Sequence, residues 1–154
     1  MKALIQRVSQ AQLSVEGKEV SNIGPGLVCY LGVGKGDGET ELRWLARKVA
    51  GLRIFSDENG KMNLSVLDQK LEILVVSQFT LFGDIRNGFR PSFSSAECPE
   101  LAEKMYLQFC EELEKAGVKK VARGVFGADM TIHQTNQGPV TLMLDSDARN
   151  LKSK

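Results

Sequence analysis

The chain has 154 residues, of which 42% are hydrophobic and 25% charged; this composition is ordinary for one globular domain and argues against disorder. Its 20 Lys and Arg residues and 19 Asp and Glu residues give a formal net charge of +1, which argues against a protein that coats nucleic acid or a membrane. The single histidine, His133, excludes a His-rich metal site and leaves one candidate base for a His-dependent triad.

Targeting and redox signals point to the cytoplasm. No apolar run approaches the roughly 18 residues of a membrane span, and the first residues become polar too early for a signal peptide. The three cysteines are widely spaced and form no CxxC pair, so we expect reduced thiols. We therefore expect a cytoplasmic protein with no metal, no cofactor and no membrane partner.

Runs with strand character recur along the chain, at residues 4–5, 13–15, 27–31, 53–55, 62–64, 71–76, 130–133 and 140–144. The runs at 27–31 and 71–76 are almost wholly apolar, which is typical of strands whose two faces are both covered. Asn59-Gly60 predicts a hairpin between the strands on either side. On local patterning alone, residues 136–139 also predict an ordinary hairpin turn, between the last two runs.

Two segments have helical periodicity. The first has one apolar face, made of Leu42, Leu45, Ala46 and Val49. The second begins at Pro99, a favourable first helical residue, and ends near Gly117. Strands and helices in this order predict a mixed α/β domain built in layers.

Polar side chains follow the apolar run 71–76 directly. Ser77, Gln78 and Thr80 supply hydroxyl and amide groups, and Phe79 lies between them. Because strand ends in α/β sheets open onto clefts, this segment could bind a neutral polar substrate, although none of these groups is basic enough to act alone as a general base. A simple turn explains the segment equally well.

The stretch 88–93, GFRPSF, also has two interpretations. Its aromatics and arginine could stack on a base or hold a phosphate. Alternatively, Phe89 and Phe93 pin an ordinary loop to the core, which is the interpretation we favour from the residues alone.

Taken together, these segments resemble the D-aminoacyl-tRNA deacylases. The resemblance rests on ALIQRV (3–8), RIFSD (53–57), GKMN (60–63), SQFTLFGD (77–84), GFRPSF (88–93), FGADM (126–130) and NQGPVT (136–141). It covers residues 1–145 and implies a single α/β domain with mainly antiparallel sheets and two principal helices. We expect residues 146–154 to form a flexible tail.

The resemblance implies an activity and its residues. Members of the family hydrolyse the ester that joins a D-amino acid to the terminal ribose of tRNA, and they also act on glycyl-tRNA. They are homodimers with active sites at the subunit interface. By this resemblance, Ser77, Gln78, Phe79 and Thr80 form the catalytic pocket floor.

Other family positions carry selection and binding. Gly138-Pro139 matches the Gly-cisPro motif, which enters the partner subunit's pocket and rejects L-substrates, and Arg7 matches the arginine that holds this motif. Phe126 and Met130 match the lining of the pocket for the terminal adenosine. The chain departs from the family at Gln137, where aspartate is usual; a local turn contact could change.

With no evident base near Thr80, we favour a positioned water and main-chain amides around Gln78 and Phe79, helped by the ribose 2′-hydroxyl of the substrate. Two rival hypotheses remain: a non-catalytic module that binds aminoacyl-tRNA or nucleotide, and an enzyme for L-aminoacyl-tRNA with a trans Gly-Pro bond. Lys119, Lys120 and Arg123 could contact tRNA, but a solvated charged face is favoured. We expect no DNA partner.

Overall fold

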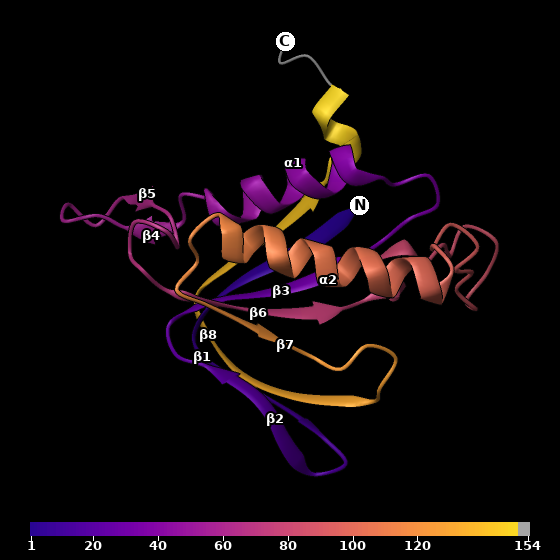
Figure 1. Cartoon of the computed structure of the whole chain (residues 1–154), viewed down its shortest axis with the longest axis horizontal. Helices are drawn as coiled ribbons and strands as arrows, with labels where there is room; N and C mark the ends of the chain where they lie inside the picture. The colour runs from indigo at the N-terminus through magenta and orange to yellow at the C-terminus, as the bar shows by residue number, and fades with distance from the viewer. Residues whose placement is uncertain (151–154) are drawn as a thin grey trace.

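The structure is a computed structural model of the chain that describes residues 1–150 (Figure 1). Its two principal helices are α1 (Glu39–Ala50) and α2 (Pro99–Lys115), and η1 (Phe79–Phe82) and η2 (Ser146–Asn150) are short 3₁₀ helices. The strands are β1 (Lys2–Val15), β2 (Lys18–Ile23), β3 (Gly26–Gly32), β4 (Phe55–Ser56), β5 (Met62–Leu64), β6 (Glu72–Ser77), β7 (Lys120–Arg123) and β8 (Met130–Asp145). No helix within residues 1–150 is long and apolar enough to cross a membrane.

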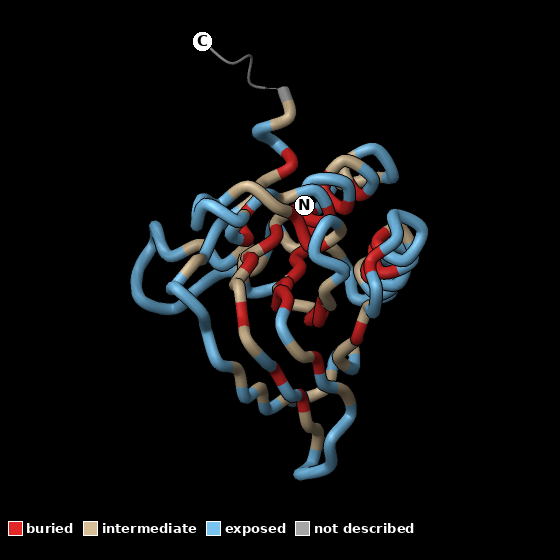
Figure 2. Tube along the Cα trace, turned by 90° about the vertical axis from the view of Figure 1, so that its left-hand side faces the viewer, coloured by how far each residue is buried: buried red, intermediate tan, exposed pale blue. Residues whose placement is uncertain are grey.

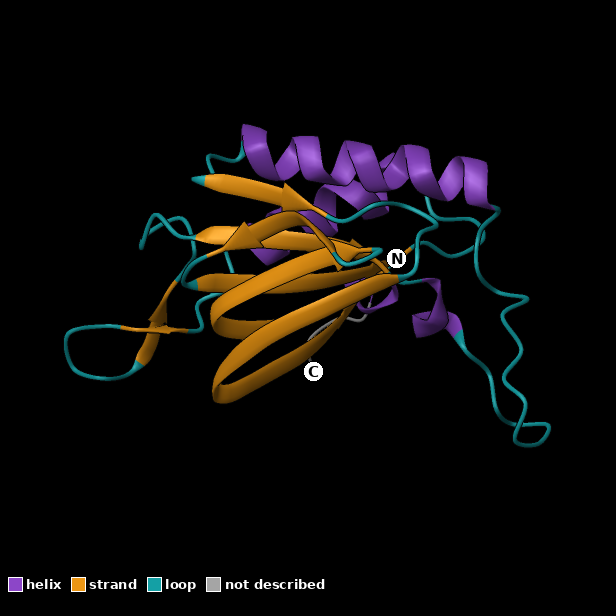
Figure 3. Cartoon of the chain, turned by 90° about the horizontal axis from the view of Figure 1, so that it is seen from below, coloured by secondary structure: helices purple, strands orange, loops and turns teal. Residues whose placement is uncertain are grey.

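One mixed sheet organises the domain. Its strand order is β2-β1-β3-β6-β7, and β8 lies along the other side of β1. The β1 pairings are all antiparallel, whereas β3, β6 and β7 run parallel to one another. The helices pack on one face of this sheet, as Figures 1 and 3 show. The expected layered α/β fold, with mainly antiparallel pairing and two principal helices, is confirmed.

The two central strands, β3 and β6, are covered on both faces, as their apolar sequences predict. Cys29 and Val75 belong to the core beneath the helices, which the apolar faces of α1 and α2 complete. The alternate residues Val28 and Leu74 belong to a second core on the opposite face. Figure 2 shows the buried segments, in red, gathered in the interior of the molecule. Period-two alternation between two hydrophobic clusters explains why residues 27–29 of β3 and 73–76 of β6 are all apolar.

The second core is closed by the sheet itself. The far half of β1 curves over it with β2 and β8 (Figure 1). Leu13 belongs to the same hydrophobic cluster as Leu74, and Ile132 packs against that cluster. The Nζ of Lys120, on β7, donates to the carbonyl of Asn22, on β2, at 2.7 Å. The sheet therefore curls until its two outer strands approach each other.

The structure tests the predictions for the Asn59-Gly60 hairpin, the cysteines and the last strand. The hairpin at Asn59-Gly60 is confirmed, because β4 and β5 pair antiparallel and Gly60 has φ 74°. The three cysteines are free thiols, as predicted. The prediction of two strands joined by a hairpin turn at 136–139 was wrong: β8 is one strand that pairs with β1 on both sides of Gly138-Pro139. Strand β7 was not predicted.

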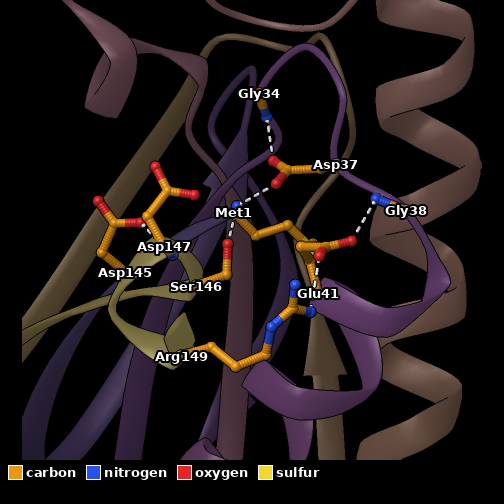
Figure 4. Close-up of polar contacts among 9 residues, drawn as sticks. All are labelled: Met1, Gly34, Asp37, Gly38, Glu41, Asp145, Ser146, Asp147 and Arg149. Atoms are coloured by element: carbon orange, nitrogen blue, oxygen red, sulfur yellow. Dashed lines mark hydrogen bonds and ion pairs between the residues drawn. The ribbon is translucent and has the colours of Figure 1, made fainter. Parts of the chain in front are cut away.

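The two ends of the described chain meet beside α1 (Figure 4). The buried ammonium of Met1 donates to Asp37 Oδ1 and to Ser146 Oγ, each at 2.5 Å, and the amide of Ser146 donates to the Met1 carbonyl at 2.9 Å. Arg149 also forms an ion pair with Glu41 at 2.6 Å. Residues 146–149 are therefore anchored, in contrast to the flexible tail expected from residue 146, and residues 151–154 lie outside the described part.

Candidate active site

The polar segment that follows β6 lies where two parallel strands end together. Ser77 is in register with Leu31 on β3, and the amide of Gln78 continues the pairing by donating to the Leu31 carbonyl at 2.8 Å. The chain then turns into η1, which begins at Phe79. The carboxyl ends of parallel strands are where α/β sheets place ligand sites, so this edge fits the predicted role.

A cavity of about 400 Å³ opens beside this segment. Ser77, Gln78 and Phe79 form part of its wall, together with residues of β3, the segment before α2, α2 itself and the loop after β7: Leu31, Val33, Phe93, Ala96, Glu97, Pro99, Ala102, Tyr106, Phe126 and Gly127. Its lining is mainly apolar and aromatic, with few polar groups. Such a cavity suits a flat, largely apolar ligand group that is oriented by a few hydrogen bonds.

Aromatic contacts hold the walls of the cavity. Phe79 and Phe93 pack edge to face with their ring centroids 5.0 Å apart, and Tyr106 lies 6.1 Å from Phe126. The Tyr106 hydroxyl donates to the Val75 carbonyl at 2.9 Å. Burial raises the pKa of Tyr106 well above its usual range, so its hydroxyl stays protonated and serves as a structural donor rather than as an acid or base.

Within residues 1–149, no acidic or basic side chain forms a hydrogen bond with the Thr80 hydroxyl. Its exposed hydroxyl oxygen accepts a hydrogen bond from the Gln78 side-chain amide. His133 lies instead in a polar groove between β1, β2 and β8. Glu97 is the one charged side chain among the described lining residues, and its carboxylate accepts from the amide of Cys98 at 2.8 Å, at the start of α2. A base-activated hydroxyl nucleophile therefore finds no support in this geometry.

Main-chain amides offer an alternative way to stabilise negative charge. The Gln78 amide is already paired with Leu31, which corrects the expectation that it is available. The amides of Phe79 and Thr80 open η1, and neither donates a hydrogen bond to the described part of the chain. These two amides, one residue further along than expected, are the donors that an oxyanion could use.

Gly138-Pro139 forms a cis peptide bond on the exposed surface of β8. The pairing of β8 with β1 passes from Asn136 opposite Val8 to Thr141 opposite Gln6, so residues 137–140 bulge out of the sheet. Gly138 has φ 125°, and a Cβ there would lie 2.9 Å from a methyl group of Val140. This tight geometry requires glycine.

Arg7 anchors the bulge by hydrogen bonds from its guanidinium. Its Nε donates to the Gln137 carbonyl at 3.1 Å, and its Nη1 donates to the Ile54 carbonyl at 2.6 Å. The contact to residue 137 uses the main chain, so glutamine in place of the family's usual aspartate leaves it intact. Neither Arg7 nor the bulge lines the cavity of the same chain.

The remaining candidate residues fall in different places. Phe126 lines the cavity, whereas Met130 packs against the second core and does not line it. Lys119 and Lys120 lie near Glu72, at 3.6 and 4.0 Å, beside the opposite end of β6 from the cavity. Arg123 forms an ion pair with Glu114 at 2.7 Å. These basic groups form charged contacts within the chain, in line with the favoured interpretation.

Sequence comparisons place the chain among known proteins. The pattern that defines the family D-Tyr-tRNA(Tyr) deacylase matches residues 4–145. A D-aminoacyl-tRNA deacylase of Magnetococcus marinus is 55% identical over 145 residues, which cover 94% of this chain and 96% of the relative. One of Thermotoga petrophila is 54% identical over 146 residues, covering 95% and 97%.

Solved structures agree with this placement. A structure described as a c-Myc DNA unwinding element binding protein has a TM-score of 0.89 at 43% identity and covers 94% of this chain and 98% of its own. A second, described as a probable eukaryotic D-amino acid tRNA deacylase, has a TM-score of 0.78 at 17% identity, covering 93% and 97%, and shows the shared fold. Together with the family match over residues 4–145, these relatives show that the chain belongs to the D-Tyr-tRNA(Tyr) deacylase family, as its motifs predict.

Proposed function

We propose that the chain hydrolyses the ester between a D-amino acid, or glycine, and the terminal ribose of tRNA in the cytoplasm. The observation that carries this proposal is the polar end of β6 facing a largely apolar cavity of about 400 Å³. The names of the relatives from Magnetococcus marinus and Thermotoga petrophila support the same substrate class. The terminal adenosine would enter the cavity and contact Phe126, while Met130 would act only through the packing behind it.

The chemistry that we propose relies on water and the main chain. Water adds to the ester carbonyl, and the amides of Phe79 and Thr80 stabilise the oxyanion that forms. The bond to the ribose 3′-oxygen then breaks, and the proton that the water gives up passes to this oxygen through the neighbouring 2′-hydroxyl, which accepts one proton as it donates another. Ser77 and Gln78 orient the substrate at the cavity edge. An activated ester needs little more than positioning and charge stabilisation.

We further propose that selection against L-amino acids comes from the Gly138-Pro139 turn of a second chain in a homodimer. The turn is exposed and lies outside its own cavity, and its strand β8 pairs with no described strand other than β1. Leu142 and Met143 beside it are exposed apolar residues, which suits a surface that another copy covers. Carbonyls of the turn would accept from the substrate's α-amino group, and an L-side chain would then collide with the backbone.

The deciding experiment compares deacylation of D-, L- and glycyl-tRNA by the wild type and by Pro139→Ala. We expect the wild type to hydrolyse the D- and glycyl-esters and to spare the L-ester. Equal rates on D- and L-substrates would contradict the chiral filter. Tight binding of an aminoacyl-adenosine analogue without hydrolysis would instead favour a non-catalytic binding module.

Thr80→Val separates the water mechanism from a side-chain nucleophile. Because the Thr80 main-chain amide remains, we expect single-turnover deacylation to stay within about tenfold of the wild-type rate. Loss of the reaction with unchanged substrate binding would show that the hydroxyl itself reacts. Thr80→Ser, which keeps the hydroxyl, is the matched control.

We also propose that duplex DNA is not a ligand of this chain, although one structural relative is described as a DNA-binding protein. The net charge is +1, and Lys119, Lys120 and Arg123 are engaged by acidic side chains. Binding to duplex DNA depends on free basic groups that meet phosphates. Inhibition of tRNA deacylation by an equal concentration of duplex DNA would contradict this proposal.

A further inference from the structure

The loop between η1 and α2 includes a closed, ordered excursion, which we call the 84–92 loop. Asp84 and Ser92 close it with two main-chain hydrogen bonds of 2.8 Å each. Arg86 ties down the entry by an ion pair of 2.6 Å with Asp84 and by donating its own amide to the same carboxylate. Figure 3 shows the chain after η1 extending away from the sheet and helices.

The aromatic side chain at the tip has no structural role within the chain. Phe89 is fully exposed, at 106% of its reference area, so the expectation that it pins the loop to the core was wrong. Phe93 instead packs against Phe79 at the wall of the cavity. Arg90, next to Phe89, is also exposed, and no ion pair engages it within residues 1–149. The loop thus presents a free aromatic face beside a free guanidinium.

The position of the loop links it to the cavity. Phe93 lines the cavity and lies four residues after Phe89, a span of at most about 14 Å. A stacked nucleic-acid strand advances about 3.4 Å per nucleotide. A strand whose last nucleoside occupies the cavity can therefore reach Phe89 within about four nucleotides.

We propose that the 84–92 loop binds the unpaired nucleotides that precede the aminoacylated end of tRNA, with Phe89 stacking on a base and Arg90 contacting a phosphate. This inference rests on the proposed function, because it takes the terminal nucleoside to lie in the cavity. Unpaired bases stack on aromatic side chains irrespective of sequence, and arginine supplies the matching charge. A single aromatic with one arginine also agrees with the near-neutral charge of the chain, since few phosphates need be contacted.

The test compares two substrates: D-aminoacyl-tRNA and the D-aminoacyl ester of adenosine, which lacks the preceding nucleotides. We expect Phe89→Ala to lower kcat/KM on tRNA, relative to kcat/KM on the adenosine ester, by at least about fivefold, the loss of one stacked base. Phe89→Trp should retain the wild-type ratio. Ile85→Ala, which shortens another exposed apolar side chain of the same loop but no aromatic face, is the matched control and should also retain it.

Arg90 gives an independent readout. If it meets one phosphate of a single strand, Arg90→Ala should reduce the slope of log affinity for tRNA against log salt concentration by about 0.7. An unchanged slope would overturn the phosphate contact.

Other outcomes separate this inference from the proposed function. An equal loss on both substrates, or none on tRNA, would overturn the stacking role. A change in the mass of the Phe89→Ala protein in solution would show that the loop contacts another copy, and would also overturn it. If the wild type hydrolyses neither substrate, the proposed function fails, and the binding of uncharged tRNA then tests the role of the loop by itself. Weaker binding by Phe89→Ala than by the wild type would support nucleotide binding by the loop. Equal binding by both, or no binding by the wild type, would refute it.

Discussion

Replacing Arg7 with methionine should loosen the Gly138-Pro139 turn without unfolding the domain. Methionine keeps an unbranched, flexible stem but removes both hydrogen bonds, to the carbonyls of Gln137 and Ile54. A hydrogen bond from a charged donor contributes about 1.5–3 kcal/mol, and the exposed bond to Gln137 belongs at the lower end. Losing about 1.4 kcal/mol lowers the ratio of correctly placed to displaced turns about tenfold.

The assay is steady-state deacylation of D- and L-aminoacyl-tRNA beside thermal unfolding. We expect kcat/KM on the D-substrate to fall by up to about tenfold, mainly through a higher KM, because the turn would hold the α-amino group in ground and transition states alike. Discrimination against the L-substrate should fall as well. Arg7→Lys restores the charge but not the fork that reaches two carbonyls, so it should recover only part of the loss.

A purely structural role for Arg7 gives a different pattern. Thermal stability would then fall in Arg7→Met, while KM and the ratio of D- to L-rates stayed at wild-type values. That result would refute the reasoning that Arg7 positions the turn for substrate.

Two further predictions concern charges away from the cavity. Asp37→Asn leaves the buried ammonium of Met1 without its counter-ion, so chemical denaturation should show that the free energy of unfolding falls by about 3–5 kcal/mol. The control Glu39→Gln breaks an exposed ion pair on α1 and should lower it by less than about 1 kcal/mol. Similar losses in both variants would contradict the importance of burial. Hydrogen bonds from Arg86 lower the pKa of Asp84 from 3.8 to about 2, so the ionised carboxylate stabilises the closed 84–92 loop above pH 3.8, and this contribution is lost as the pH falls through about 2. Titration of the Asp84 carboxyl by NMR with an apparent pKa near 4 would contradict this.

Local patterns predicted the elements whose own residues carry a clear hydrophobic or turn pattern. The apolar runs of β3 and β6, the faces of α1 and α2, and the Asn59-Gly60 turn are all read from neighbouring residues, and each is confirmed. Strand β7 was not predicted because its apolar stretch is short and follows two lysines, Lys119 and Lys120. It is stabilised by pairing with β6, which is distant in the sequence.

The wrong prediction of a hairpin turn at residues 136–139 has a similar cause. Glycine and proline usually end strands, yet here β1 pairs with residues on both sides of them and absorbs the extra residues as a bulge. At the candidate site, motifs located the cavity wall from Ser77 to Phe79, but only the geometry shows that the amide of Gln78 is already engaged. Phe89 and Phe93 look equivalent in sequence, but in the structure Phe93 is half-buried against Phe79 while Phe89 is fully exposed.

The pairing of β1 with β8 also has a consequence for how the protein is made. The strand synthesised first takes as its long neighbour the strand synthesised last, about 130 residues later. At roughly 5–20 residues per second, one edge of β1 would wait on the order of 10 s for its partner. An unpaired edge of this length is a template for aggregation, so the nascent chain needs protection until translation of β8 is complete, and truncation before residue 130 would leave that edge permanently open.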